Sequence, residues 1–353
     1  MQAYANLDLR GGAVEAQTPS TRFIFEFPEL LRRFETIDPQ AQRSRRLSRI
    51  TGIASIGLVL AALLLASADP AMEALDRELR EAIGYAAAIL GLSGTLLGLA
   101  TMGKASPRAR WLRERLHSEY LRLFHFHYMA QRLPAALRAQ GDPGQAAWLA
   151  DRAAALARLE QTALSDPART CDQLLADREF APFAGLLEPV ATGFAATGKP
   201  VEDAFAAWRA LRLEWQLAYC EAKLSDEANG ASARRQAKLF ARIAWACIAA
   251  IVALHLLHFL EHWLHLSRVL LQTATIWTAL IALGARALES GLAPLREVER
   301  YEQYRSNIRV ALRRFDSAAT PQSRLEVMRA FEATSQEEML VFIRTHAKSH
   351  FLL

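Results

Sequence analysis

Two uncharged apolar segments, separated by a short charged stretch, constrain this chain more than any other feature. Ile50–Ala68 and Ala82–Gly103 contain no acidic or basic residue, and Asp69–Glu81 lies between them. An α-helix rises about 1.5 Å per residue, so the first segment would be about 28 Å long, close to the roughly 30 Å hydrocarbon core of a bilayer. The pattern therefore predicts a transmembrane hairpin of two helices.

A second pair of apolar segments, nearer the C-terminus, has the same organisation. Ile243–Leu260 and Val269–Ala285 are separated by a short stretch that contains charged residues and histidines. Each pair follows a basic stretch and precedes a charged one that contains Leu-Arg-Glu, at Leu112–Glu114 and at Leu295–Glu297. We interpret this similarity as an internal duplication, which predicts a pseudo-two-fold arrangement of the two hairpins in the membrane.

The rest of the chain has the composition and the breaks of a helical protein. Ala, Leu, Arg and Glu are frequent, and no run of β-branched residues indicates a strand. We therefore predict an all-α integral membrane protein with two transmembrane helical hairpins and a cytosolic helical bundle. The expected organisation is a flexible leader over residues 1–24, a first hairpin unit over 25–120, a cytosolic helical region over 121–230, and a second hairpin unit with C-terminal cytosolic helices over 231–353.

Breaks and capping patterns predict the ends of the soluble helices. Residues 289–317 are expected to form one long charged helix after the fourth span, and Thr320-Pro321 to begin the next. Thr334 with Glu337 resembles a capping box, which predicts that the last helix opens there. The other helices are expected over residues 108–139, 145–164, 168–177, 183–196 and 201–223.

The distribution of charge predicts the orientation of the spans. The formal net charge is +5, and many of the cations flank the apolar segments, as Arg45, Arg46 and Arg49 do. Juxtamembrane cations mark the cytoplasmic side and attract anionic lipid headgroups, so we expect a lipid bilayer as partner and no nucleic acid. Asp69–Glu81 carries five acidic residues and two arginines, and we expect it outside, with both termini cytoplasmic. The three scattered cysteines indicate a reduced compartment without a disulfide framework.

Small residues recur along one face of the second apolar segment. They are Ala87, Gly91, Gly94 and Gly98, of which the last two form a GxxxG pair. Small residues let helix backbones approach closely in lipid, where apolar burial provides little drive for association. This face is expected to pack within the hairpin or, alternatively, between subunits of an oligomer.

Polar residues lie on one flank of the fourth apolar segment. Gln272, Thr275 and Thr278 are the candidates for lining a pore or a water-filled seam, because polar groups in hydrocarbon usually face another helix, the backbone or water. Threonine can also bond to the carbonyl one turn back, which satisfies the hydroxyl locally. Glutamine has no such local solution, so Gln272 is the most informative of the three.

Four histidines follow the third apolar segment at spacings of three, four and three residues. These spacings predict that His255, His258, His262 and His265 lie on one helical face. Imidazole ligates transition metals and titrates near neutral pH, so a metal or proton site is one interpretation. The favoured interpretation is an interfacial stripe with Trp263, and we assign no metal ligand.

The sequence lacks the common catalytic motifs. It contains no GxxxxGK[ST], GxGxxG, GxSxG or HExxH pattern. Acidic residues of the soluble helices usually stand beside Arg or Lys, as on solvated, ion-paired helix faces. We therefore predict a protein that is not an enzyme and that binds no cofactor.

The order of a basic lead-in, a two-span hairpin and a long charged helix resembles the SLATT group of bacterial membrane effector domains, here in tandem. The aromatic and charged stretch Arg209–Tyr219 upstream of the second hairpin adds to this similarity. The resemblance implies a multi-pass protein of the bacterial inner membrane in an antiphage or conflict system, with a nucleotide second messenger or a sensor protein as partner. It implies no catalytic residue, and the four-span form departs from the two-span pattern of the group.

Three hypotheses for function follow. The first is a homo-oligomeric membrane effector that forms a pore or perturbs the inner membrane when triggered. The second is a membrane-anchored adaptor for a cytosolic partner, and the third is a metal or proton transporter that uses the histidines.

Overall fold

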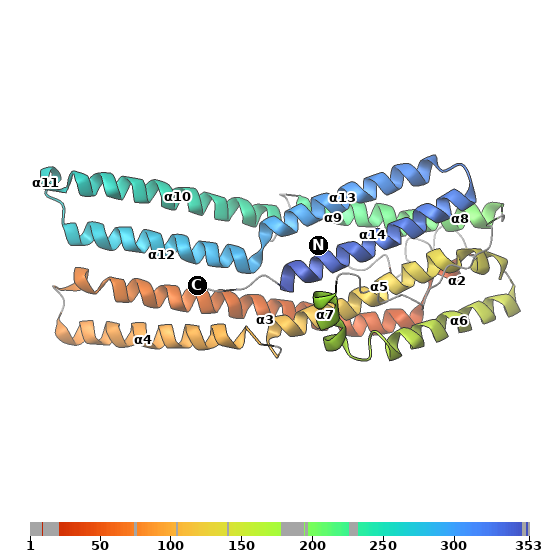
Figure 1. The fold of residues 1–353 in the computed structure, drawn as a ribbon, viewed down its shortest axis with the longest axis horizontal. Helices are drawn as coiled ribbons and strands as arrows, with labels where there is room; N and C mark the ends of the chain where they lie inside the picture. Colours follow the sequence, from red (N-terminus) through yellow and green to blue (C-terminus); the bar gives the residue numbers. More distant parts are fainter. Residues whose placement is uncertain are drawn as a thin grey trace. The chain divides into compact units, whose positions relative to one another are not determined.

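The structure is a computed structural model that describes residues 9, 21–73, 76–103, 105–139, 141–177, 194, 197–225, 232–347 and 351. All regular structure in these ranges is helical, which confirms the all-α prediction (Figure 1). Apart from residue 194, the helix predicted over 183–196 lies outside the described residues, as does nearly all of the predicted leader.

The chain divides into two compact units. Unit 1 comprises Met1–Gln42, Trp111–Ser225 and Val298–Ala347, and unit 2 comprises Arg43–Arg110, Asp226–Glu297 and Lys348–Leu353. Both apolar pairs therefore belong to unit 2. Residues 25–42 and 111–120, which the sequence grouped with the first hairpin, belong to unit 1.

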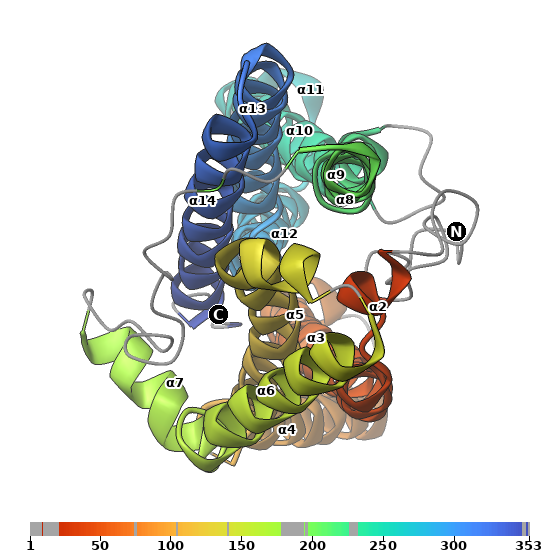
Figure 2. The ribbon, with the colours of Figure 1, turned by 90° about the vertical axis from the view of Figure 1, so that its right-hand side faces the viewer.

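Unit 1 is a bundle of helices around a large apolar core (Figure 2). At its centre, the buried ring of Trp208 lies 5.5 Å from the ring of Phe315 and 6.1 Å from that of Phe331, between centroids. Its elements are α2 (Arg22–Phe25), the start of α3 (Pro28–Ser67), most of α5 (Pro107–Arg138), α6 (Asp142–Gln161), α7 (Pro167–Ala176), α8 (Lys199–Trp208), η3 (Arg209–Glu214), α9 (Trp215–Leu224), most of α13 (Pro294–Ser317) and α14 (Pro321–Ala347).

Two of the predicted ends in unit 1 can be compared with the structure. The helix predicted over 168–177 corresponds to α7, which Asp166 caps, because its carboxylate accepts hydrogen bonds from the backbone N–H groups of Ala168 and Arg169. The prediction that a capping box at Thr334 begins the last helix is wrong, since α14 runs through this position without a break. The Thr334 hydroxyl instead donates to the carbonyl of Ala330 one turn back, which satisfies it inside the helix.

Residues 199–224 show how tertiary packing modifies a predicted helix. The sequence predicts one α-helix here, whereas η3 between α8 and α9 is a π-helical turn. Leu211, Arg212 and Leu213 are consecutive and all are buried, so this turn is surrounded on several sides. π-turns inserted in helices are rare and often occur at functional positions.

Unit 2 consists of two helical hairpins. The first hairpin is formed by α3 and α4 (Arg77–Ala100), with η2 (Asp69–Met72) between them. The second is formed by α10 (Ala233–Phe259) and α12 (Arg268–Leu292), with α11 (Glu261–Leu264) between them. In Figure 1, α3 and α12 lie side by side, with α4 beyond α3 and α10 beyond α12.

The long helix predicted over 289–317 is interrupted. Ala293 has a left-handed conformation, with φ 48°, and ends α12 before α13 begins at Pro294. Proline fits the first position of a helix, where its missing N–H has no partner to lose. Pro107 begins α5 after the first hairpin in the same way, which extends the similarity between the two halves of the chain.

Candidate functional site in the apolar helical unit

The two units bury their apolar side chains in opposite ways. Among the described residues, Leu175, Val310 and Val341 are the exposed large hydrophobic side chains of unit 1, and all the others belong to unit 2. In unit 2, Phe259 is 84% exposed and Trp263 is 81% exposed. A soluble monomer rarely exposes a continuous apolar surface of this extent.

Four helices of the described residues are long and apolar enough to cross a membrane. They contain α3, α4, α10 and α12, as the two apolar pairs predicted. Within the most apolar stretch of each, between 11% and 22% of the residues are buried. The apolar side chains of these helices therefore face outward rather than into a core of their own.

The first hairpin is closed by the small residues that the sequence singled out. The Ser55 hydroxyl on α3 donates to the backbone carbonyl of Gly94 at 2.8 Å, which joins the two helices directly. A Cβ on Gly94 would lie 2.9 Å from the backbone nitrogen of Val59, and one on Gly98 would lie 2.8 Å from the Ser55 hydroxyl. The helices can approach this closely because glycine stands at these positions.

The remaining members of the small-residue face lie on the same side of α4. Ala87 is buried, and a Cβ on Gly91 would lie 3.4 Å from the Cβ of Ala62 on α3. The face therefore packs against α3 within the hairpin, which is the first of the two interpretations that the sequence left open.

A second seam joins the two hairpins along α3 and α12. The indole N–H of Trp277 donates to the carbonyl of Leu64 and to the hydroxyl of Ser67, each at 3.1 Å. Nearer the end of α12, a Cβ on Gly284 would lie 2.9 Å from a methyl group of Leu60. As the numbers fall along α3 they rise along α12, so the two helices are antiparallel neighbours.

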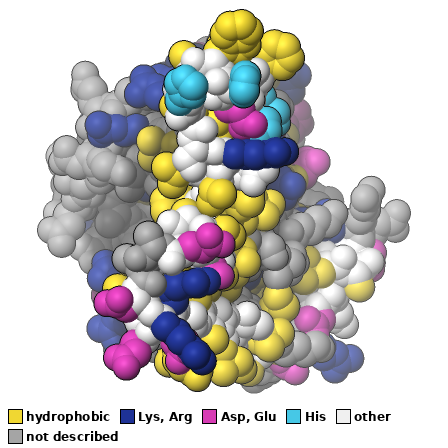
Figure 3. Space-filling view, turned by 90° about the vertical axis from the view of Figure 1, so that its left-hand side faces the viewer, with side chains coloured by type: hydrophobic (Ala, Val, Ile, Leu, Met, Phe, Trp, Pro, Cys, Tyr) yellow, Lys and Arg dark blue, Asp and Glu magenta, His cyan; other side chains and the backbone are white. Residues whose placement is uncertain are grey.

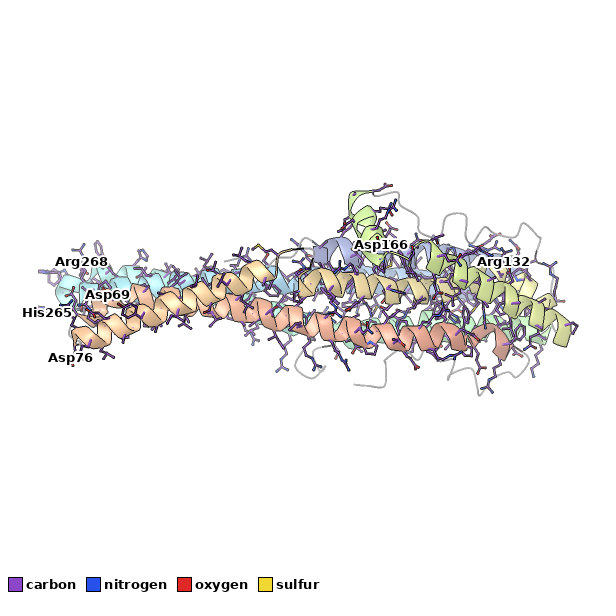
Figure 4. The ribbon with its side chains drawn as sticks, turned by 90° about the horizontal axis from the view of Figure 1, so that it is seen from below. Asp69, Asp76, Arg132, Asp166, His265 and Arg268 are labelled. Atoms are coloured by element: carbon purple, nitrogen blue, oxygen red, sulfur yellow. The ribbon has the colours of Figure 1, made fainter. Side chains whose placement is uncertain are left out.

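Both hairpin turns lie at one end of unit 2. Figure 4 places Asp69 and Asp76 of the first turn at the same end as His265 and Arg268 of the second. Figure 3 faces this end and shows the histidines gathered beside hydrophobic side chains, with acidic and basic side chains both next to them and elsewhere on the same face. This arrangement suits two turns on the same side of a membrane.

The polar candidates of the fourth span are placed differently from one another. The hydroxyls of Thr275 and Thr278 donate at 2.8 Å to the carbonyls of Leu271 and Ala274, one turn back. Gln272 is exposed and lies one turn from the start of α12. Thr273, which was not among the candidates, is the buried one.

The four histidines do not share one helical face, which corrects the prediction from their spacing. α10 ends at Phe259, so His255 and His258 lie on α10, whereas His262 lies on α11 and His265 ends that short helix with φ 51°. The Nδ1 of His258 lies 2.9 Å from a carboxylate oxygen of Glu261. Among the described residues, no group of three or more His, Cys, Asp or Glu side chains could hold a metal ion.

Unit 1 contains buried polar groups that the sequence analysis did not identify. Arg152 on α6 donates to the carbonyls of Phe23, Ile24 and Glu26, and so satisfies the C-terminal end of α2. Burial, together with the positive charges of Arg152 and Arg212, lowers the pKa of His125 to about 3. His125 is therefore neutral at physiological pH. Protonating it would place a third positive charge in an interior that already holds two cations.

Comparison of the chain with protein-family models, with curated proteins and with solved structures finds no match.

Proposed function

We propose that unit 2 spans a membrane with its four apolar helices, with both turns outside and unit 1 in the cytoplasm. The observation that carries this proposal is the outward exposure of the apolar side chains of unit 2, in contrast to the large buried core of unit 1. Exposing such a surface to hydrocarbon carries no free-energy penalty, whereas exposing it to water does. Two tryptophans add support, because Trp245 on α10 and Trp263 on α11 are exposed, and tryptophan is enriched at membrane interfaces.

We further propose that the protein is a bacterial inner-membrane effector. In this proposal it oligomerises, and it forms a pore or perturbs the membrane when a trigger acts on unit 1. The resemblance to SLATT domains supports the class of function, with a nucleotide messenger or a sensor protein as trigger. A single protomer offers little polar lining, since Ser55, Thr275 and Thr278 bond to backbone carbonyls within unit 2. Conduction therefore requires several copies.

Cysteine labelling in intact cells tests the topology. The three native cysteines are buried and would be replaced by alanine. Single cysteines are then introduced at exposed positions, as Glu73→Cys and Leu264→Cys in the turns and Ser317→Cys in unit 1. A membrane-impermeant maleimide should label the two turn variants in intact cells and the Ser317→Cys variant after lysis alone. Labelling of all three before lysis, or of the Ser317 variant alone, would overturn the topology.

Membrane potential in expressing cells tests the effector function. Expression at a level that gives oligomers should depolarise the cells, in the presence of the trigger if one is required. A protein that stays monomeric at every concentration in detergent and in lipid would contradict a pore.

The second candidate function is a membrane-anchored adaptor. The observation that favours it is that the hydroxyls of Ser55, Thr275 and Thr278 bond to backbone carbonyls within unit 2. Such helices present few free polar groups, as an inert anchor would. Replacing residues 50–103 and 243–285 with unrelated hairpins distinguishes the two functions. An adaptor should keep its activity after this exchange, whereas a pore should lose it.

A further inference from the structure

A phenylalanine close to the C-terminus occupies the seam between the two hairpins. The side chain of Phe351 is buried and packs with Ile56 of α3 and Ala287 of α12. A Cβ placed on Gly52 of α3 or on Gly291 of α12 would overlap the Phe351 ring. The ring therefore lies directly against the backbones of both helices, at positions where glycine alone leaves room for it.

The position of the ring follows from the register of the seam. Towards the turns, α3 and α12 touch directly, through Leu60 with Gly284 and through Leu64 with Trp277. Towards the other end, the ring of Phe351 lies between the two helices and contacts Gly52 on α3 and Gly291 on α12. Glycine is the least favourable residue inside a helix apart from proline, so two glycines facing one ring need a compensating contact, and the ring provides it.

We infer that Gly52 and Gly291 form a slot that binds an aromatic ring, that the chain fills the slot with its own Phe351, and that the filled slot holds the two hairpins together at this end. The functional part of this inference rests on the proposed membrane function. When the ring is in place, the seam is closed by an apolar group. When it leaves, the backbone at the two glycines loses that cover.

The slot also provides a route for a trigger. Phe351 belongs to unit 2, and it follows the last residue of α14, Ala347, by four positions. α14 packs in unit 1, where its Met328 and Ile343 are fully buried. A ligand that binds better to the state with an empty slot would shift the protein towards that state.

Photo-crosslinking tests the slot without reference to conduction. A diazirine-bearing phenylalanine analogue is introduced at position 351 of the full chain, reconstituted in vesicles of phosphatidylethanolamine and phosphatidylglycerol. Crosslinks should map to the peptides that contain Gly52 and Gly291. Gly52→Ala or Gly291→Ala should lower their yield roughly tenfold, which corresponds to about 1.4 kcal/mol. Gly57→Ala is the matched control, because a Cβ at Gly57 on the same helix meets nothing within 4 Å. Crosslinks elsewhere, or a yield that the slot variants do not change, would overturn the slot.

Dye release from the same vesicles tests the consequence. Phe351→Ala, Gly52→Ala and Gly291→Ala should each raise the leak roughly tenfold over the wild type, and Gly57→Ala should not. Three variants that alter different residues are expected to give one phenotype, and far-UV circular dichroism checks that each is folded. Correct crosslinks with no leak from any variant would support the slot and refute the pore. Leak from the wild type without the expected crosslinks would refute the slot and leave the pore in place.

Discussion

The buried ion pair between Arg212 and Glu332 allows a quantitative test of how unit 1 is stabilised. The guanidinium of Arg212 on η3 donates two hydrogen bonds to the carboxylate of Glu332 on α14, at 2.9 and 2.8 Å. The side chains are 2% and 0% exposed. The Arg212 guanidinium also lies 4.5 Å from the ring centroid of Phe126 and 5.6 Å from that of Phe331. The pair therefore has two-point hydrogen bonding and aromatic contacts, but no access to water.

Arg212→Ala is expected to lower the free energy of unfolding by about 3–5 kcal/mol, because it leaves the Glu332 carboxylate buried without its partner. Glu332→Ala should have a similar effect by isolating the guanidinium. The double variant Arg212→Met with Glu332→Leu removes both charges and keeps apolar volume, so it should be much closer to the wild type. Chemical denaturation in a mild detergent, followed by tryptophan fluorescence, measures these changes.

An exposed pair on the same turn provides the control. Arg209 lies three residues before Arg212 and bonds to Asp316 at 2.8 Å, with side chains that are 33% and 51% exposed. Because water and salt screen such a pair, Arg209→Ala should cost about 1 kcal/mol or less. Equal losses for Arg209→Ala and Arg212→Ala would refute the argument from burial. So would a double variant as unstable as either single variant.

Three further predictions follow from single positions. Gly94→Leu should destabilise the first hairpin by about 1–3 kcal/mol in detergent unfolding, because its side chain meets the α3 backbone, whereas Gly84→Leu faces open space and should be tolerated. Burial depresses the pKa of His125, so its contribution to stability is full above its unfolded pKa of about 6.5 and is lost as the pH falls towards about 3. Between pH 7.5 and 4.5 the wild type should lose about 2–3 kcal/mol more than His125→Phe in parallel denaturation curves, and equal losses would contradict this. Ala293→Gly should increase the free energy of unfolding by about 1 kcal/mol, and so raise the thermal midpoint, because glycine adopts the left-handed conformation without the steric penalty of a Cβ.

The four apolar helices could be predicted from the sequence because hydrocarbon imposes a simple rule. A helix that faces lipid needs an uncharged apolar run of sufficient length, and Ile50–Ala68 or Val269–Ala285 satisfies this without reference to any other part of the chain. The small-residue face of α4 was visible for the same reason, since its periodicity is local. Its partner was not visible, because Ser55 and Val59 are ordinary residues of an apolar segment until the hairpin closes.

The features that the sequence did not reveal all depend on distant contacts. Arg212 looked like one more cation of a charged helix, and only packing against α14 makes it a buried partner of Glu332. Thr334 and Glu337 match a capping pattern, but the helix continues because Phe331 and Met339 on either side are buried in the same core. Phe351 carries no local signal at all. The signals that could have drawn attention to it are Gly52 and Gly291, two glycines in otherwise helical segments with no local reason to be there.

The way in which the chain passes between its units limits how a trigger could act. The borders of the two units at residues 42, 110 and 297 fall inside α3, α5 and α13. Interrupting a helix at such a point would break backbone hydrogen bonds, and each hydrogen bond that is lost costs free energy. Phe351 is different, because it is not helical and is held by side-chain packing in the slot. A signal that requires little energy should therefore act on the aromatic contact first, and a shift of the long helices should follow once the seam between α3 and α12 is released.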